Sequence, residues 1–232
     1  MLKLPIAYLV QQINRRTSIT TKKTFLKRLF QNISYLCLQV MARNREFNEQ
    51  EAIKRAMDVF WKKGYNGASM RDLTDAMQIN SSSLYNSIGD KHKLFVKCIQ
   101  NYTEERMKEA KAHASQAKTP LKAIVNFIQD SVNTILYSNN SCLAIKTTFE
   151  VAANDSAIQA ILKSDADKTH SLLAELIIKA REQKEIDSEE DPETIADFIM
   201  NAFTGWYESY ILYQNPVKIK KMAKYLITRI SQ

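Results

Sequence analysis

The sequence predicts an all-α fold, and three observations support that prediction. The 232 residues include only four glycines and four prolines, so few positions favour turns and helices can be long. Three of the prolines directly follow a residue that caps helices well, which is the first-turn placement that helices tolerate. These pairs are Thr119–Pro120, Asp191–Pro192 and Asn215–Pro216. Apolar residues also recur at helical spacing along most of the chain.

The net charge of +8 is spread unevenly, and its distribution indicates three regions. Residues 1–40 hold seven Lys/Arg and no acidic residue. Residues 41–102 hold ten basic and seven acidic residues, whereas residues 103–232 hold sixteen basic and eighteen acidic ones. A basic N-terminal part followed by a mildly acidic C-terminal part is typical of a protein that binds phosphate with one face. We therefore divide the chain at these boundaries into a basic N-terminal extension, residues 1–40, and two further regions, residues 41–102 and 103–232.

The extension, residues 1–40, is too short in its apolar part to span a bilayer and lacks the small-residue cleavage site of a signal peptide. Three alternatives stay open for it: a basic arm that contacts DNA, a disordered tail, or the product of a wrongly assigned start codon.

The first helix of the region 41–102 is expected over residues 46–64. Ile53, Ala56, Met57 and Phe60 form its apolar stripe, and Gly64 is the expected C-cap.

The segment from Ser69 to Phe95 follows the grammar of a helix-turn-helix. Ser69 is a good N-cap for the first helix of this motif, and that helix should end near Gln78. Asn80 or Ser81 should cap a second short helix, which Gly89 ends. The side chains of that second helix are small or polar apart from Leu84 and Tyr85, which suits a helix that lies in the major groove.

These residues resemble the DNA-binding domain of the TetR family of transcriptional regulators over roughly residues 46–102. The resemblance is carried by the following positions: Ala52, Ala56, Phe60, Gly64, Tyr65, Ala68, Ser69, Leu84, Tyr85, Lys91, Leu94 and Phe95. Two positions depart from the family pattern. Gln78 stands where a small residue is usual, which suggests a slightly different turn, and Ile88 stands where an aromatic is common.

Eight residues are predicted to contact DNA. They are Ser69, Arg71, Ser81, Ser82, Ser83, Tyr85, Asn86 and Lys91. The serine hydroxyls can bond bases or phosphates, and Asn86 can address adenine. The resemblance implies phosphate contacts for Tyr85, Lys91, Ser69 and Arg71. The alternatives are capping or simple exposure for the serines and packing for Tyr85.

The positions of the remaining helices are predicted from N-cap residues and from apolar residues at helical spacing. We expect a connector from Asp90 to about Ala117, and helices from Pro120, from Cys142 to Ala153, and from Asp155 onward. An acidic loop, Glu185–Asp191, should precede a helix over Pro192–Tyr213, and Pro216 should begin the last one.

The helix Pro192–Tyr213 is apolar on more than one face, which indicates burial on two sides. The resemblance implies that it and the last helix form a homodimer interface. The candidates are Phe203, Tyr210, Met222 and Leu226. Closure of a monomer core is the alternative.

The resemblance thus implies that residues 41–102 form a helix-turn-helix DNA-binding domain and that residues 103–232 form a helical effector-binding and dimerisation domain. It also implies a pocket for a small-molecule effector among the C-terminal helices. Residues that place polar or aromatic groups there are Asn133, Tyr137, Thr147, Thr148, Phe149, Asn201, Thr204, Trp206 and Tyr207. Each could equally be core or surface.

Other functional classes find little support. No nucleophile–base pair, zinc-protease motif or glycine-rich phosphate loop is apparent, and the histidines and three scattered cysteines show no metal-ligand or disulfide pattern, so we expect no enzyme, metal or cofactor. Cys98 should be core, and Cys142 is a weaker candidate for redox sensing.

The sequence thus predicts a cytoplasmic, sequence-specific DNA-binding regulator, a repressor that a small ligand releases from a palindromic operator in double-stranded DNA. A helix-turn-helix activator, or a regulator that binds a partner protein without a small ligand, is the alternative.

Overall fold

The computed structural model describes residues 48–137 and 142–231. The chain divides into two units, residues 1–48 and 49–232, and every described helix belongs to the second unit. The basic segment 1–40 and the predicted domain start at Met41 lie outside the described residues. The described part is helical and contains no strand, as the composition predicts.

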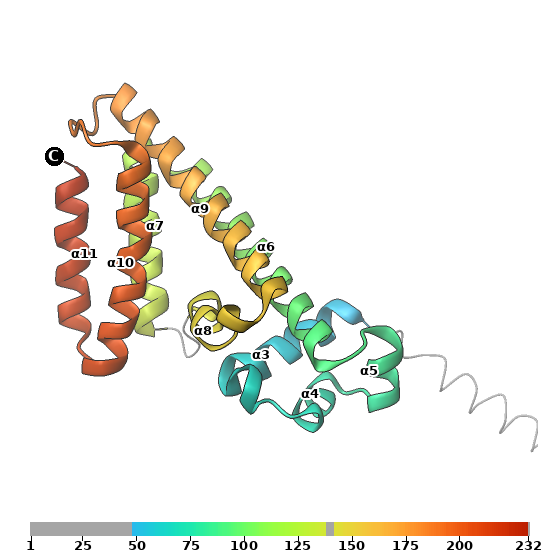
Figure 1. Cartoon of the computed structure of the whole chain (residues 1–232). Coiled ribbons are helices and arrows are strands. Elements are labelled where there is room, and N and C mark those ends of the chain that lie inside the picture. Colours follow the sequence, from blue (N-terminus) through green and yellow to red (C-terminus); the bar gives the residue numbers. More distant parts are fainter. Residues whose placement is uncertain (1–47, 138–141, 232) are drawn as a thin grey trace, which may run out of the picture. The chain divides into compact units, whose positions relative to one another are not determined.

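Four helices form the N-terminal part of this unit (Figure 1). They are α3 (Glu49–Gly67), α4 (Met70–Met77), α5 (Ser81–Ser87) and α6 (Lys91–Gln116). Their common core contains Phe60, Leu73, Leu84 and Phe95, each at most 1% exposed. The rings of Phe60 and Phe95 meet edge to face at 4.8 Å, which fixes α3 against the start of α6.

The C-terminal part consists of five α-helices and one short 3-10 helix (Figure 1). They are α7 (Pro120–Tyr137), α8 (Leu143–Glu150), η1 (Ala152–Asn154), α9 (Ser156–Glu182), α10 (Pro192–Tyr213) and α11 (Pro216–Ile230). Helix α6 runs beside α9, while α7, α10 and α11 pack together, as Figure 1 shows. The apolar stripes of α7, α9, α10 and α11 share one core that includes Ile128, Ile177, Ile199 and Leu226.

Caps predicted from the sequence begin most of these helices. Asp90, Asp155, Asp191 and Asn215 each accept hydrogen bonds from backbone N–H groups in the first turn of the following helix. In α10 and α11 the proline stands in the first turn, as expected.

Two boundaries differ from the expectation. Helical structure continues past Gly64 to Gly67, but Gly64 itself has φ 73° and ψ 174°, so the glycine forms a kink instead of the final cap. The expected helix from Cys142 to Ala153 is interrupted at Val151, where φ is −127° and α8 gives way to η1. In the described residues, no helix is long and apolar enough to cross a membrane.

Candidate nucleic-acid interface and ligand cavity

A complete capping box begins α4. The Ser69 hydroxyl accepts a hydrogen bond from the backbone N–H of Asp72 at 3.1 Å, and the Asp72 carboxylate accepts from the Ser69 backbone at 3.0 Å. The Lys63 ammonium also donates to Asp72, at 2.6 Å. Together with the bonds from Ser69, it holds the pKa of Asp72 well below its usual range. The predicted DNA contact Ser69 is therefore also a structural cap.

The turn between α4 and α5 contains Gln78 in the left-handed conformation, with φ 58° and ψ 39°. Its N–H bonds the Asp75 carbonyl at 3.2 Å, and the Ile79 N–H bonds the Thr74 carbonyl at 3.1 Å. These bonds satisfy carbonyls at the end of α4. A non-glycine residue is strained in this conformation. Position 78 is also where the sequence departs from the small residue that is usual in the family.

Helix α5 places its polar residues on the outside and a single leucine inside. Leu84 is fully buried, whereas Ser81, Ser82, Ser83, Tyr85 and Asn86 are all exposed, with Tyr85 56% exposed. The side chain of Asn80 accepts from the Ser83 backbone at 2.7 Å and so caps the helix. A short helix held by one apolar anchor and presenting small polar groups can approach the edges of base pairs closely.

The remaining predicted DNA contacts lie at the starts of α4 and α6. Arg71 has a 90% exposed side chain, 3.7 Å from the carboxylate of Asp75. The Lys91 ammonium lies over the ring of Tyr65, 4.6 Å from its centroid, in the first turn of α6. The N-terminus of a helix favours anions, so a phosphate oxygen would meet both the Lys91 charge and the helix N–H groups.

Helix α8 is hydrogen-bonded to α3, a contact that sequence reasoning missed. Glu150 accepts from the backbone N–H groups of Tyr65 at 3.1 Å and Asn66 at 2.9 Å, and the Lys146 ammonium donates to the Trp61 carbonyl at 3.0 Å. A Cβ at Gly64 would lie 2.7 Å from the Glu150 carboxylate, so the glycine makes room for this contact. We call these bonds the α8–α3 clamp.

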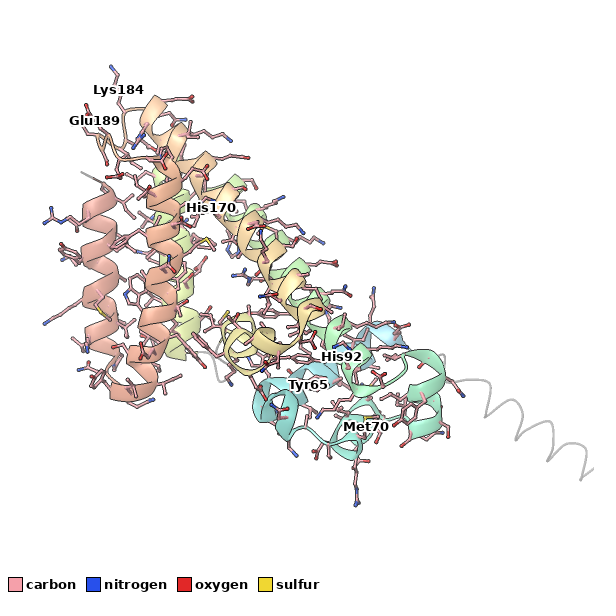
Figure 2. The ribbon with its side chains drawn as sticks, in the orientation of Figure 1. Tyr65, Met70, His92, His170, Lys184 and Glu189 are labelled. Atoms are coloured by element: carbon pink, nitrogen blue, oxygen red, sulfur yellow. The ribbon has the colours of Figure 1, made fainter. Side chains whose placement is uncertain are left out.

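A hydrogen bond joins the same region to α9. The His92 ring lies 2.7 Å from the carboxylate of Asp155, which caps α9. Figure 2 marks Tyr65 and His92 where α3, α6 and α8 meet. Burial, and then the nearby Asp155 charge, raise the pKa of Tyr65.

A cavity of about 810 Å³ lies among α3, α6, α7, α8, α9 and α10. Of the predicted ligand contacts, Asn133, Thr148 and Thr204 line it. The other six do not: Thr147 and Trp206 are buried in packing contacts, Tyr207 packs against the core, and Tyr137, Phe149 and Asn201 are exposed. The volume suits a drug-sized molecule.

The wall of the cavity includes a polar cluster that sequence reasoning also missed. The Arg106 guanidinium of α6 is hydrogen-bonded to Asp165 of α9 and lies 3.2 Å from the Thr169 hydroxyl. Asp165 is only 6% exposed, and burial raises its pKa although Arg106 opposes that shift. A weak signal existed, because Asp165 lies on the same apolar stripe of α9 as Ile158 and Leu162.

The two described cysteines have different surroundings. Cys98 is fully buried, as predicted, and burial raises the pKa of its thiol. Cys142 lines the cavity with its sulfur 3.5 Å from the Tyr102 hydroxyl.

The predicted dimer contacts are less exposed than an interface would suggest. Phe203 lines the cavity and packs on Phe127 at 5.7 Å, Leu226 is 3% exposed, and Tyr210 and Met222 pack against the core of the single chain. The exposed apolar surface of α10 and α11 is formed instead by residues that sequence reasoning did not select. They are Phe198, Ile211, Leu212, Tyr213, Val217 and Tyr225.

Comparisons with known proteins give consistent matches. Residues 52–98 match the family model "Bacterial regulatory proteins, tetR family", and residues 117–226 match "Tetracyclin repressor-like, C-terminal domain". Together the two models cover about two thirds of the chain.

The chain matches two curated relatives over most of their length. The uncharacterized HTH-type transcriptional regulator YezE of Bacillus subtilis is 25% identical over 152 residues, 65% of this chain and 78% of YezE. The HTH-type transcriptional repressor DhaR of a Mycobacterium species is 20% identical over 157 residues, 67% of this chain and 78% of DhaR.

Solved structures share the fold. The TetR family regulator CifR, a cysteine mutant in complex with a 26-base-pair operator, has a TM-score of 0.69 at 22% identity, and the match covers 79% of this chain and 97% of CifR.

Proposed function

This chain belongs to the TetR family of DNA-binding transcriptional regulators, and we propose that it is a repressor that binds a near-palindromic operator as a homodimer and leaves it when a small ligand fills the cavity. The fold and family are those of regulators and not of enzymes. We propose further that it works in the cytoplasm, where bacterial chromosomal DNA lies.

For the DNA-binding domain, residues 41–102, we propose that α5 reads the base edges while α4 and α6 hold the phosphates. The exposure of Ser82, Ser83 and Asn86 supports the first role, and the placement of Lys91 over Tyr65 in the first turn of α6 supports the second. Repressor activity is supported by DhaR, which is named a repressor, and double-stranded operator binding by the CifR complex.

The observation that carries the ligand response is the double role of α8. On one side it lines the cavity through Ala144, Ile145 and Thr148. On the other side it forms the α8–α3 clamp through Lys146 and Glu150. A ligand that displaces α8 would therefore shift the helix on which the DNA-binding core is built.

The proposed homodimer places two copies of α5 on one side of the pair. Two-fold symmetry requires half-sites in inverted repeat, and two copies of α5 that meet the same face of the duplex require a spacing of one helical turn, roughly 34–36 Å, or a multiple of it. The exposed apolar residues of α10 and α11 support an interface formed by these helices.

Selection of bound duplexes from a random library by the full chain tests the proposal. We expect an inverted repeat, and light scattering should give a dimer at micromolar concentration. A monomer, or a bound sequence without two-fold symmetry, would contradict it.

Transcription from a promoter that carries the selected site should fall when the protein is present, whereas a rise would favour the activator.

A further inference from the structure

We propose that the cavity takes a monovalent organic cation with an aromatic or bulky apolar body. This inference rests on the proposed ligand response and specifies the chemical class of its effector. It is carried by the charge of the lining, by its aromatic rings and by a buried carboxylate with an unused oxygen.

The lining is acidic in a basic protein. It contains the carboxylates of Glu105, Glu109, Asp130 and Asp165 but a single guanidinium, that of Arg106. Four carboxylates against one guanidinium leave a formal charge of −3 with His113 neutral, whereas the whole chain carries +8. The field inside the cavity therefore opposes an anion and attracts a cation.

Two basic side chains lie close to these carboxylates. Glu105 is paired with Lys54 at 3.1 Å, and Asp130 lies 3.1 Å from His113. Both pairs are about half exposed, so water and salt weaken them. No hydrogen bond or ion pair involves the Glu109 carboxylate among the residues that the structure describes, and this exposed group adds an unbalanced negative charge at the edge of the cavity.

Asp165 provides an independent observation in the lining of the cavity. Its side chain is 94% buried, yet its Oδ1 atom has no hydrogen-bond partner in the described structure, and neither has the buried Nε atom of Arg106, because the two residues join through Nη2 and Oδ2. A buried carboxylate oxygen without a partner is costly, and a positive charge bound in the cavity offsets part of that cost through space.

The apolar lining suits the body of such a cation. Two aromatic pairs line the cavity from different helices: Trp61 with Tyr102 at 5.2 Å, and Phe127 with Phe203 at 5.7 Å. Ring faces attract cations, and this attraction strengthens where water is excluded. Alanine and isoleucine side chains complete the wall, so the site combines an apolar surface with negative charge.

The test compares two ions of equal shape and opposite charge. Tetraphenylphosphonium and tetraphenylborate each carry four phenyl rings around a central atom. Calorimetric titration of the full, DNA-free chain should give one tetraphenylphosphonium per chain, and tetraphenylborate should bind at least tenfold more weakly. Equal or tighter binding of tetraphenylborate, or no binding of either ion, would overturn the proposal.

Two variants and one control test which carboxylates attract the cation. We expect Glu109→Gln and Asp130→Asn each to weaken tetraphenylphosphonium binding about three- to tenfold, the size expected for one partly exposed charge near the ligand. Glu104→Gln is the matched control, because Glu104 is an exposed carboxylate on the same helix as Glu109 but does not line the cavity. If the three variants bind alike, the carboxylates of the lining do not select the ligand.

Asp165→Asn adds a fourth variant, with the greatest expected loss. Because it leaves the Arg106 charge buried without its partner, it is interpreted only if its thermal unfolding matches that of the parent chain. The other variants decide the question if it does not fold.

Operator binding separates this inference from the proposed function. A chain that binds its operator but ignores tetraphenylphosphonium contradicts only the ligand class. A chain that binds tetraphenylphosphonium in the calorimeter but selects no duplex contradicts the proposed function and leaves the ligand class standing.

Discussion

Lys91 and Asn86 should contribute to DNA binding in different ways, Lys91 through a phosphate and Asn86 through a base. Lys91 lies over the Tyr65 ring in the first turn of α6, where a phosphate would gain from both the charge and the helix N-terminus. Lys91→Ala should weaken binding to every duplex and reduce the slope of log K against log salt by about one unit. Lys108→Ala, at an exposed lysine later in the same helix, is the control. A changed sequence preference with an intact salt slope would contradict the phosphate role.

Asn86→Ala should behave differently, because its amide is exposed on α5 and is proposed to address a base. We expect a loss of about 1–3 kcal/mol that is confined to one base pair, with relaxed preference there and an unchanged salt slope. Binding to a panel of single-substitution duplexes measures this. A uniform loss across the panel would assign Asn86 to the backbone instead.

At the scale of the element, the start of α4 should respond to pH through Asp72. The Lys63 ammonium and the Ser69 cap hold the pKa of Asp72 below its unfolded value of about 4. A depressed folded pKa stabilises the fold above the unfolded pKa, and this contribution is lost as pH falls toward the folded pKa. The difference in free energy of unfolding between the parent and Asp72→Asn should be full near pH 7 and should shrink below about pH 4.

Denaturant titrations at several pH values measure that difference. Asp75→Asn, which removes a 72% exposed carboxylate from the same helix, supplies the control. A gap that stays constant down to about pH 2 would show that the charge of Asp72 does not matter.

The α8–α3 clamp makes Gly64 a critical position. Its φ of 73° disfavours any side chain, and an added Cβ would lie 2.7 Å from the Glu150 carboxylate. Gly64→Ala should therefore lower the free energy of unfolding by about 1–3 kcal/mol. Gly67→Ala, three residues later, meets its nearest atom at 3.7 Å and should be tolerated. Equal thermal unfolding of the two variants would contradict this account of the clamp.

Local sequence signals predicted most of the elements, although they missed the break at Val151, and they did not predict the contacts between elements. Caps such as Asp90 and Asp191 act on N–H groups two or three residues away, so spacing alone predicted where α6 and α10 begin. In the clamp, Glu150 bonds Asn66 and Tyr65, which precede it by 84 and 85 positions in the sequence. Arg106 and Asp165 are separated by 59 positions. No local periodicity encodes such pairs, which explains why the polar cluster in the cavity wall was missed.

At the scale of the whole molecule, the proposed dimer gives a test on the exposed faces of α10 and α11. Phe198 and Leu212 are 63% and 64% exposed, so a charge at either position costs the single chain little. Phe198→Asp and Leu212→Asp should yield folded monomers by light scattering that no longer hold a two-half-site duplex. Ile178→Asp, at an exposed position on α9, should remain dimeric. Dimers in all three variants would exclude α10 and α11 as the interface.

The basic extension, residues 1–40, gives the last prediction: it is dispensable for specific operator recognition. The predicted DNA contacts all lie between Ser69 and Lys91, and α3 begins at Glu49 with an ion pair to Lys97 of α6 that holds its first turn in place. Deleting residues 1–40 should therefore preserve dimerisation and sequence preference. It should lower nonspecific affinity at low salt, because up to seven counterion-releasing charges are removed. Since salt screens such charges, an electrophoretic comparison of both forms across a salt series should show the difference shrinking as salt rises. Loss of folding or of specific binding in the shorter form would show that the extension is an integral part of the DNA-binding domain.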